Sequence, residues 1–155
     1  MGGQGAGAAL QKLRHYCTYQ ERSHFEVQQK LRELRIPYAY HDEIIATLIN
    51  EDYLNEERFA IQFAGGKFRM KEWGKKKILY ALKEKRVSEY CIKKALSSID
   101  EEDYVKTLGK LAEEKYASLK GETFLDRKKK IIDYLIQKGY EYDLINKALS
   151  SISDK

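Results

Sequence analysis

Apolar residues recur along this chain with the spacing of a buried helix face, and no stretch shows the strict alternation of a half-buried strand. One set has the spacing i, i+3, i+4, i+7: Ile92, Ala95, Leu96 and Ile99. This spacing predicts a helix that starts after Ser88 and buries one face. The abundance of Lys, Glu, Leu, Ala and Ile, with a single proline, favours helix elsewhere in the chain.

The same pattern repeats along the chain at a nearly constant interval. The letters KALSSI fill residues 94–99 and again residues 147–152, which lie 53 positions later. A weaker copy upstream, residues 31–36, precedes residues 82–87 by 51 positions. Such internal similarity is the signature of stacked supersecondary units. The sequence therefore predicts an all-α protein made of three tandem three-helix repeats stacked into an elongated, curved body.

Domain boundaries follow from the repeat. Residues 1–9, which read MGGQGAGAA, are rich in Gly and Ala, and we expect them to be a flexible lead or a tag remnant outside the fold. The three repeats are then expected at residues 10–50, 51–99 and 100–155. Function on such an array is expected on an extended surface, because stacked repeats do not enclose a single deep pocket.

Cap and breaker residues refine the helix boundaries. Asn55 has the character of an N-cap, and Leu54 and Phe59 have the spacing of a hydrophobic staple. The helix that starts there is predicted to bend or end at Gly65–Gly66, because each glycine costs about 1 kcal/mol in a helix interior. Gly139 is predicted to end another helix in a left-handed conformation.

The predicted core residues follow the same helical periodicity in each repeat. They are Leu10, Leu13, Val27, Leu31, Leu34, Ile44, Ile45, Leu48 and Ile49 in the first repeat, Phe59, Ala60, Phe63, Ile78, Leu79, Leu82, Ile92, Ala95, Leu96 and Ile99 in the second, and Tyr104, Leu108, Leu111, Tyr116, Ile131, Ile132, Leu135, Ile145, Ala148, Leu149 and Ile152 in the third.

Charge adds a candidate surface to this picture. The 155 residues carry a formal net charge of +5, which permits a polyanionic partner without requiring one. The excess is local, because residues 67–86 contain nine Lys or Arg against two Glu. Its first half crowds cations around a tryptophan: Lys67, Arg69, Lys71, Trp73, Lys75, Lys76 and Lys77. A weaker cluster occurs at the matching place in the third repeat: Arg127, Lys128 and Lys129.

Two interpretations of the main cluster remain open. Phosphate groups or an acidic protein surface suit such a concentration of cations. Alternatively, the lysines only solvate an exposed helix face. For Trp73 alone we favour a packing role between two helices. We also assign packing and helix termination to the KALSSI segments and to DYLNEERFA at residues 52–60, and we expect most of the twelve tyrosines to pack at module boundaries.

Several classes of function find no support in the residues. Cys17 and Cys91 are isolated, and the three histidines have no partner at a metal-ligand spacing, so neither a metal site nor a disulfide framework is expected. No nucleophile, base and metal set converges, and we expect neither an enzyme nor a cofactor. No apolar run approaches the roughly 20 residues of a membrane span, and no signal peptide begins the chain, so we expect a cytoplasmic protein.

Two segments resemble the RecX family of bacterial recombination regulators. DYLNEERFA at residues 52–60 is similar to an acidic Glu-Arg-Phe-Ala element of the family, and WGKKKILYALKEKRV at residues 73–87 is similar to its Gly-Pro-basic-basic-Ile segment. The likeness covers about residues 9–153. The chain departs from the family pattern at Lys75, where proline is common, and at Gly65–Gly66, within a stretch that is usually helical and basic.

This resemblance implies a non-enzymatic regulator in DNA repair, homologous recombination and the SOS response. Such a protein binds the recombinase RecA, chiefly as a filament on single-stranded DNA, and mainly inhibits its recombinase and coprotease activities. The alternative is a sequence-independent nucleic-acid-binding module that uses the same basic cluster. Weak direct DNA binding by the regulator itself is left open, and a monomer is expected.

Overall fold

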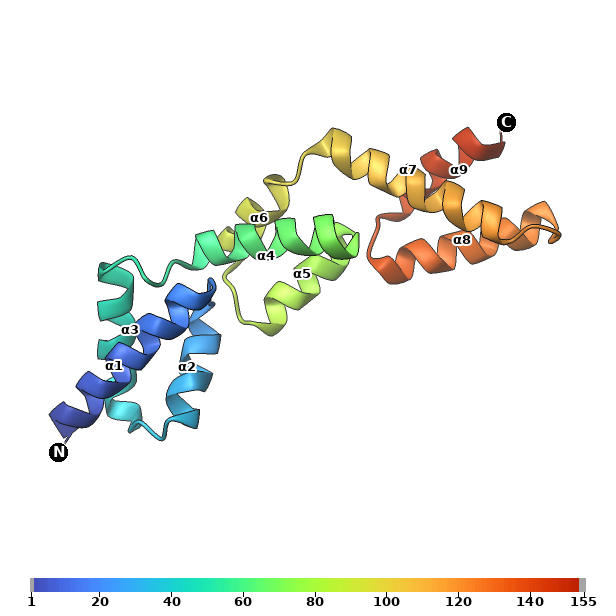
Figure 1. Ribbon diagram of the computed structural model, residues 1–155. Helices are drawn as coiled ribbons and strands as arrows, with labels where there is room; N and C mark the ends of the chain where they lie inside the picture. The colour runs from blue at the N-terminus through green and yellow to red at the C-terminus, as the bar shows by residue number, and fades with distance from the viewer. Residues whose placement is uncertain (1, 154–155) are drawn as a thin grey trace. The chain divides into compact units, whose positions relative to one another are not determined.

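The computed structural model describes residues 2–153, and the regular structure in that range is entirely helical (Figure 1). The chain forms an all-α repeat fold, as the sequence predicts. We call the three successive sets of helices modules 1, 2 and 3. Module 1 contains α1 (Gly2–Tyr19), α2 (His24–Glu33), a short 3-10 helix η1 (Tyr38–Tyr40) and α3 (His41–Asn50). Module 2 contains α4 (Glu56–Lys71), α5 (Lys75–Glu84) and α6 (Glu89–Ser97), and module 3 contains α7 (Glu101–Ser118), α8 (Phe124–Lys138) and α9 (Tyr142–Ser153).

The modules share a set of buried positions at the two intervals seen in the sequence. In modules 1 and 3 each of the three main helices contacts the other two. The first shared position, on the second helix, is filled by Val27, Ile78 and Ile131, and all three side chains are fully buried. A second shared position is filled by Leu31, Leu82 and Leu135. A third, at the end of each module, is filled by Leu48, Ile99 and Ile152. The periodicity of the sequence therefore reflects one packing scheme used three times.

The second helix of every module ends in the same way. Arg35, Arg86 and Gly139 have positive φ angles of 57°, 58° and 101°. In each case the next residue's N–H reaches back to a leucine carbonyl, from Ile36 to Leu31, from Val87 to Leu82 and from Tyr140 to Leu135. This is the Schellman arrangement. The prediction for Gly139 is confirmed, and the other two modules adopt the same left-handed cap with arginine.

The first helix begins earlier than the sequence suggests. α1 runs from Gly2 to Tyr19, although residues 1–9 are predicted to lie outside the fold; of these, Met1 is outside the described residues. Ala9 is only 2% exposed and belongs to the same buried cluster as Leu13 and Cys17. The packed face of α1 therefore extends to Ala9, and the small residues before it continue the helix.

The glycine pair in α4 does not end the helix, which continues to Lys71, so an end at Gly65–Gly66 is wrong. Burial on both sides explains this, because Ala60, Ala64 and Phe68 are all buried and hold the helix against the core. Packing of that kind outweighs the intrinsic cost of glycine in a helix. The cap predicted for this helix is present, since the Arg58 N–H donates to Asn55 Oδ1 at 2.9 Å.

Some residues predicted in the core are only partly covered. Leu96 is half-buried because α6 ends one residue later, at Ser97, and Ile49 is 43% exposed on α3. The other half-buried members are Leu10, Leu34, Ile45, Phe63, Leu79, Tyr116, Ile132 and Ala148. Helix faces have graded edges, so the periodicity identifies the face correctly and overstates its width.

The chain divides into two compact units, and the division cuts through module 2. One unit combines residues up to Phe63 with Leu82–Ala95, and the other combines Ala64–Ala81 with the residues from Leu96 onward. The first unit therefore holds module 1 with parts of module 2. The second holds module 3 with the end of α4 and most of α5.

Candidate partner-binding surface

The turn between α4 and α5 carries the main cationic cluster, and it lies within the second unit. We call its members the turn cluster: Lys67, Arg69, Lys71, Trp73, Lys75, Lys76 and Lys77. α4 ends at Lys71, and Glu72 adopts a φ of 56° that reverses the chain. The Trp73 N–H then bonds to the Lys67 carbonyl at 3.3 Å, which closes the helix. Three residues thus separate the two helices, and the cations are brought to one corner.

The start of α5 has its free N–H groups satisfied by module 3. The Gly74 N–H donates to the Lys138 carbonyl at 2.7 Å, and the Lys76 N–H donates to the Gly139 carbonyl at 2.9 Å. Between them, the Lys75 N–H donates to the Tyr104 hydroxyl at 2.8 Å. A helix leaves its first N–H groups without internal partners. The carbonyl end of α8 and a buried tyrosine therefore serve as the cap of α5.

The contact between the start of α5 and the end of α8 requires a glycine in each segment. A Cβ atom at Gly74 would lie 2.2 Å from the Gly139 carbonyl carbon and 2.4 Å from the Tyr140 nitrogen, and real Cβ atoms do not approach backbone so closely. A Cβ at Gly139 would meet Lys77 Cβ at 2.4 Å. The two backbones touch directly, and this fixes the turn cluster relative to module 3.

Two buried tyrosines reinforce the contact. The Tyr140 hydroxyl donates to the Glu72 carbonyl at 2.9 Å, and the Tyr104 hydroxyl donates to Glu141 Oε1 at 2.5 Å. Their ring centroids are 5.1 Å apart. Burial raises the pKa of both hydroxyls well above the ordinary tyrosine value, and for Tyr104 the hydrogen bond to Glu141 adds to this effect. Both side chains are therefore neutral hydrogen-bonding groups at physiological pH.

Part of the turn cluster is engaged inside the protein. Lys75 Nζ lies 3.3 Å from Glu101 and 4.7 Å from the centre of the Tyr104 ring. Lys67 and Lys77 place their ammonium groups 5.0 and 4.7 Å from the centre of the half-buried Trp73 ring. Two cations therefore lie over the Trp73 ring, and its packing between two helices stays a prediction. These three lysines are only partly available to a partner.

The remaining cations of the turn cluster are exposed. Arg69 and Lys71 are at the end of α4, and Lys76 is at the start of α5. A Cβ at Gly65 would lie 2.6 Å from the Arg69 guanidinium, so the absence of a side chain there leaves room for the arginine to lie along the helix. Arg69, Lys71 and Lys76 are therefore the three cations that a partner meets first.

The second predicted cluster is separate from the first. The Arg127 guanidinium lies 4.5 Å from the centre of the Tyr116 ring, and its Nε is buried without a hydrogen-bond partner. Lys128 and Lys129 are exposed. They lie about ten residues before the carbonyl end of α8, which corresponds to about 15 Å along the helix. Only two exposed cations are offered at this place.

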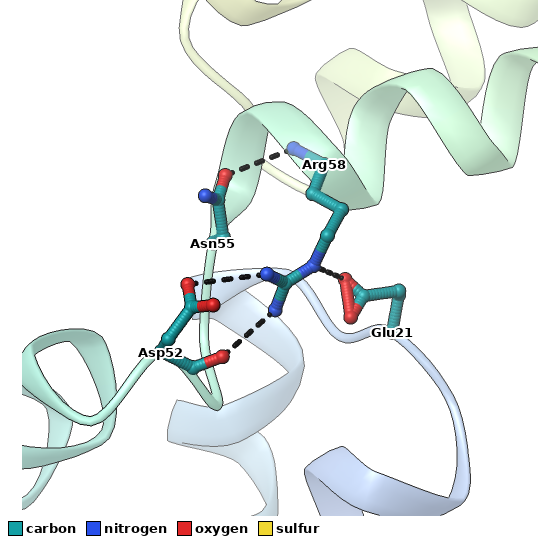
Figure 2. Close-up of polar contacts among 4 residues, drawn as sticks. All are labelled: Glu21, Asp52, Asn55 and Arg58. Carbon is teal, nitrogen blue, oxygen red and sulfur yellow. Dashed lines mark hydrogen bonds and ion pairs between the residues drawn. The ribbon is translucent and has the colours of Figure 1, made fainter.

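The DYLNEERFA segment is organised around Arg58, whose side chain joins the loop after α1, the turn after α3 and the start of α4 (Figure 2). Its Nε donates to Glu21, in the loop after α1. Its two terminal nitrogens donate to Asp52, one to the carboxylate at 3.1 Å and one to the carbonyl at 3.0 Å. The Arg58 guanidinium therefore donates these hydrogen bonds within the protein, which supports the packing interpretation of this segment.

Module 1 also has a groove, not predicted from the sequence, that is lined by Tyr16, Tyr19 and several cations. The signal was present as a second stripe on α1, distinct from its buried face.

Within residues 2–153, no group of three or more His, Cys, Asp or Glu is arranged to hold a metal ion. Among the described helices, none combines the length and apolar character needed to cross a membrane. Cys17 and Cys91 are both buried free thiols, and burial raises the pKa of Cys17 to about 11.

The comparisons with family models and with curated proteins agree on one family. Residues 55–96 match the family model described as "RecX, second three-helix domain", and residues 101–149 match "RecX, third three-helix domain". The regulatory protein RecX of Bacillus cytotoxicus is 29% identical over 140 residues, which cover 90% of this chain and 52% of that protein. The protein of the same name in Bacillus thuringiensis is 27% identical over the same length and coverage. The chain spans about half the length of the curated relatives it matches.

Solved structures show the same fold. The crystal structure of RecX from Lactobacillus salivarius superimposes with a TM-score of 0.87 at 28% identity, over 99% of this chain and 97% of that one. A second crystal structure, of a regulatory protein RecX, gives a TM-score of 0.88 at 19% identity over 96% of this chain and 73% of that one. The two matched domains together cover more than half of the residues, in the order and three-helix form that the structure shows, and the chain belongs to the RecX family of regulatory proteins.

Proposed function

We propose that this protein binds RecA and its filament on single-stranded DNA, and that it mainly inhibits recombinase and coprotease activity during DNA repair. The observation that carries the proposal is membership of a family whose curated members are named regulatory proteins. RecA as partner follows from the family resemblance of the motifs at residues 52–60 and 73–87. The role is regulatory and non-enzymatic, and it belongs in the cytoplasm with RecA.

The turn cluster supports this proposal as the contact surface. Arg69, Lys71 and Lys76 are exposed cations held on a corner whose backbone is fixed by the contact between Gly74 and Gly139. A rigid corner loses little conformational freedom on binding, so its charges act at low entropic cost. Complementary charge also steers the encounter with a negatively charged filament.

The test reverses the exposed charges and leaves the internally engaged ones alone. We expect the triple variant Arg69→Glu, Lys71→Glu, Lys76→Glu to lose at least tenfold in inhibition of RecA at low salt, because it replaces attraction with repulsion. The measurement is single-stranded-DNA-dependent ATP hydrolysis by RecA, titrated with the regulator. Lys75 and Lys77 are left unchanged, since their contacts with Tyr104 and Trp73 belong to the packing.

A matched variant controls for the change in net charge. Lys106, Lys120 and Lys147 are exposed lysines of module 3 outside both clusters, and their replacement by glutamate alters the net charge equally. We expect that control to inhibit nearly as well as the original protein. Thermal melting by circular dichroism verifies that both variants are folded. Equal inhibition by the turn-cluster variant and the control would remove the turn cluster as the contact surface.

The alternative, a nucleic-acid-binding module whose effect on RecA is secondary, predicts a different salt response. Neutralising several phosphates makes affinity fall steeply with salt, with a slope of about −0.7 per phosphate on single strands. A contact made mainly with RecA protein responds less. Affinity for the RecA filament and for the same bare DNA, each measured between 50 and 200 mM salt, therefore distinguishes the two functions. Tight binding to bare DNA with no added affinity for the filament would favour the alternative.

A further inference from the structure

Module 1 contains an open groove that the proposed function does not use. It lies between the last turns of α1 and the facing side of α2, and its volume is about 600 Å³. That size is typical of small-ligand and nucleotide sites. Six of the residues that line it carry the argument: Lys12, His15, Tyr16, Tyr19, Arg22 and Lys30. All of them belong to the first compact unit.

Helix α1 forms one wall of the groove, with a stripe that lies next to its buried stripe. Ala9, Leu13 and Cys17 face the core of module 1 at a spacing of four residues. The groove side of α1 carries a second stripe at i, i+3, i+4 and i+7, formed by Lys12, His15, Tyr16 and Tyr19. Tyr19 is 80% exposed at the mouth of the groove. An aromatic ring so far from any covering residue offers its face to a partner.

At the floor of the groove, two cations lie over the ring of Tyr16. The Arg22 guanidinium lies 3.7 Å from the centre of the Tyr16 ring, and Lys30 Nζ lies 5.4 Å from it. The Arg22 Nε also donates to the Tyr16 carbonyl at 3.1 Å, which fixes the plane of the guanidinium. Its terminal nitrogens make no hydrogen bond to any of the described residues. This arginine is positioned in advance and retains donors for a ligand.

The charged side chains that line the groove are all cationic. Lys12, Arg22 and Lys30 contribute three positive charges, and no Asp or Glu lines the groove. Within the described part of the chain, Lys12 and Arg22 have no ion-pair partner, and Lys30 is paired only with Glu33 at 3.3 Å, near the exposed end of α2. The groove is therefore a cationic site with an aromatic floor, which suits an anionic ligand that has flat unsaturated rings.

We propose that this groove binds single-stranded nucleic acid directly, with a base stacked on Tyr19 and neighbouring phosphates held by Lys12, Arg22 and Lys30. Single strands present both the faces of their bases and their phosphates, which match the aromatic and cationic parts of the groove. A duplex hides its base faces within the stack. An acidic peptide offers charge, yet it leaves the exposed ring of Tyr19 without a flat partner. The proposal goes beyond the function proposed above, because the contact needs no RecA.

The test uses the whole chain and a fluorescein-labelled 12-nucleotide oligothymidine, with binding measured by fluorescence anisotropy at low salt. We expect Tyr19→Ala to weaken binding by about 5- to 150-fold, the range for loss of one stacked base. We expect Lys12→Glu to weaken binding and to make the dependence of affinity on salt less steep, because it removes a phosphate contact. A labelled duplex of the same length is expected to bind more weakly and to be insensitive to Tyr19→Ala.

Matched variants make the result specific to the groove. Tyr38 in the same module is 75% exposed, so Tyr38→Ala removes a similar ring elsewhere, and Lys106→Glu reverses an exposed charge outside the groove. Both are expected to bind the oligonucleotide like the original protein. Equal binding by Tyr19→Ala and Tyr38→Ala overturns the proposal. So does a labelled polyglutamate peptide that binds in competition with the oligonucleotide and loses affinity on Tyr19→Ala, since the groove would then be a site for acidic protein segments.

Discussion

At the scale of single residues, the left-handed caps show what a sequence reveals and what it hides. Gly139 was predictable because glycine adopts positive φ without steric cost. Arg35 and Arg86 adopt the same conformation, with φ near 57°, although arginine gives no local signal for it. The repeat interval is the only sequence feature that equates these arginines with Gly139. Comparison between modules therefore carries information that residue propensity alone lacks.

The presence of arginine in module 1 at the left-handed cap where module 3 has glycine predicts a stabilising substitution. Arg35 is exposed and makes no ion pair with any described residue, so Arg35→Gly relieves the left-handed strain with little loss of contact. We expect a gain of about 0.5–1 kcal/mol, less than the full cost of about 1–2 kcal/mol for a left-handed residue, because glycine also gains freedom in the unfolded chain. Urea denaturation followed by circular dichroism measures the change. Gln29→Gly, at an exposed position within α2, is the control and should destabilise by about 1 kcal/mol.

At the scale of helices, the sequence predicted nearly all of the elements. It did not predict the contacts between helices that cap their ends. Periodicity and caps are local, so Asn55 and the buried stripes could be located from neighbouring residues. The cap of α5 is supplied by residues about 30 to 65 positions away: Lys138, Gly139 and Tyr104. No local pattern encodes such a contact. The continuity of α4 through Gly65–Gly66 was missed for the same reason, because tertiary burial decides it.

The backbone contact predicts opposite outcomes for two glycines. Gly74→Ala places a Cβ atom 2.2 Å from backbone atoms that cannot move independently, and we expect it to destabilise the protein by about 1–3 kcal/mol or more. Gly66→Ala, within α4, meets nothing within 4 Å and should stabilise by about 0.5–1 kcal/mol. Both values are measurable by thermal or urea denaturation. A neutral Gly74→Ala variant would mean that α5 and α8 do not touch through their backbones.

The same contact predicts a loss of stability in alkali. The folded protein holds Tyr104 and Tyr140 neutral, with pKa values raised above the ordinary value of 10.0 chiefly by burial. Their contribution is therefore complete below about pH 10 and is lost as pH rises, because the unfolded chain then releases protons that the folded chain retains. The urea midpoint should fall as pH rises above about 10. Tyr140→Phe should be less stable at pH 7, through loss of its bond to Glu72, and should show a shallower decline.

At the scale of the whole molecule, the resemblance of two segments to the RecX family implied the class of function, charge located a candidate surface, and the structure refined that surface. The sequence grouped seven residues of the turn cluster by their position alone. The structure divides them, because Lys67, Lys75 and Lys77 lie over aromatic rings while the exposed cations are Arg69, Lys71 and Lys76. Lys75 contacts residues of another module, and Lys67 and Lys77 reach Trp73 only through the turn that the folded chain forms. For that reason, sequence could locate the cluster and could not say which of its cations are available.

The two proposed surfaces predict a quantitative relation between variants. Tyr19 belongs to one compact unit and the turn cluster to the other. Changes at sites without shared partners usually add in free energy within about 0.3–0.5 kcal/mol. If the groove holds single-stranded DNA while the turn cluster meets the RecA filament, the losses in affinity should multiply when Tyr19→Ala is combined with the turn-cluster variant. The measurement is binding to RecA filaments by all four proteins of the cycle. A combined loss no larger than either single loss would mean that both changes disrupt one and the same step of binding.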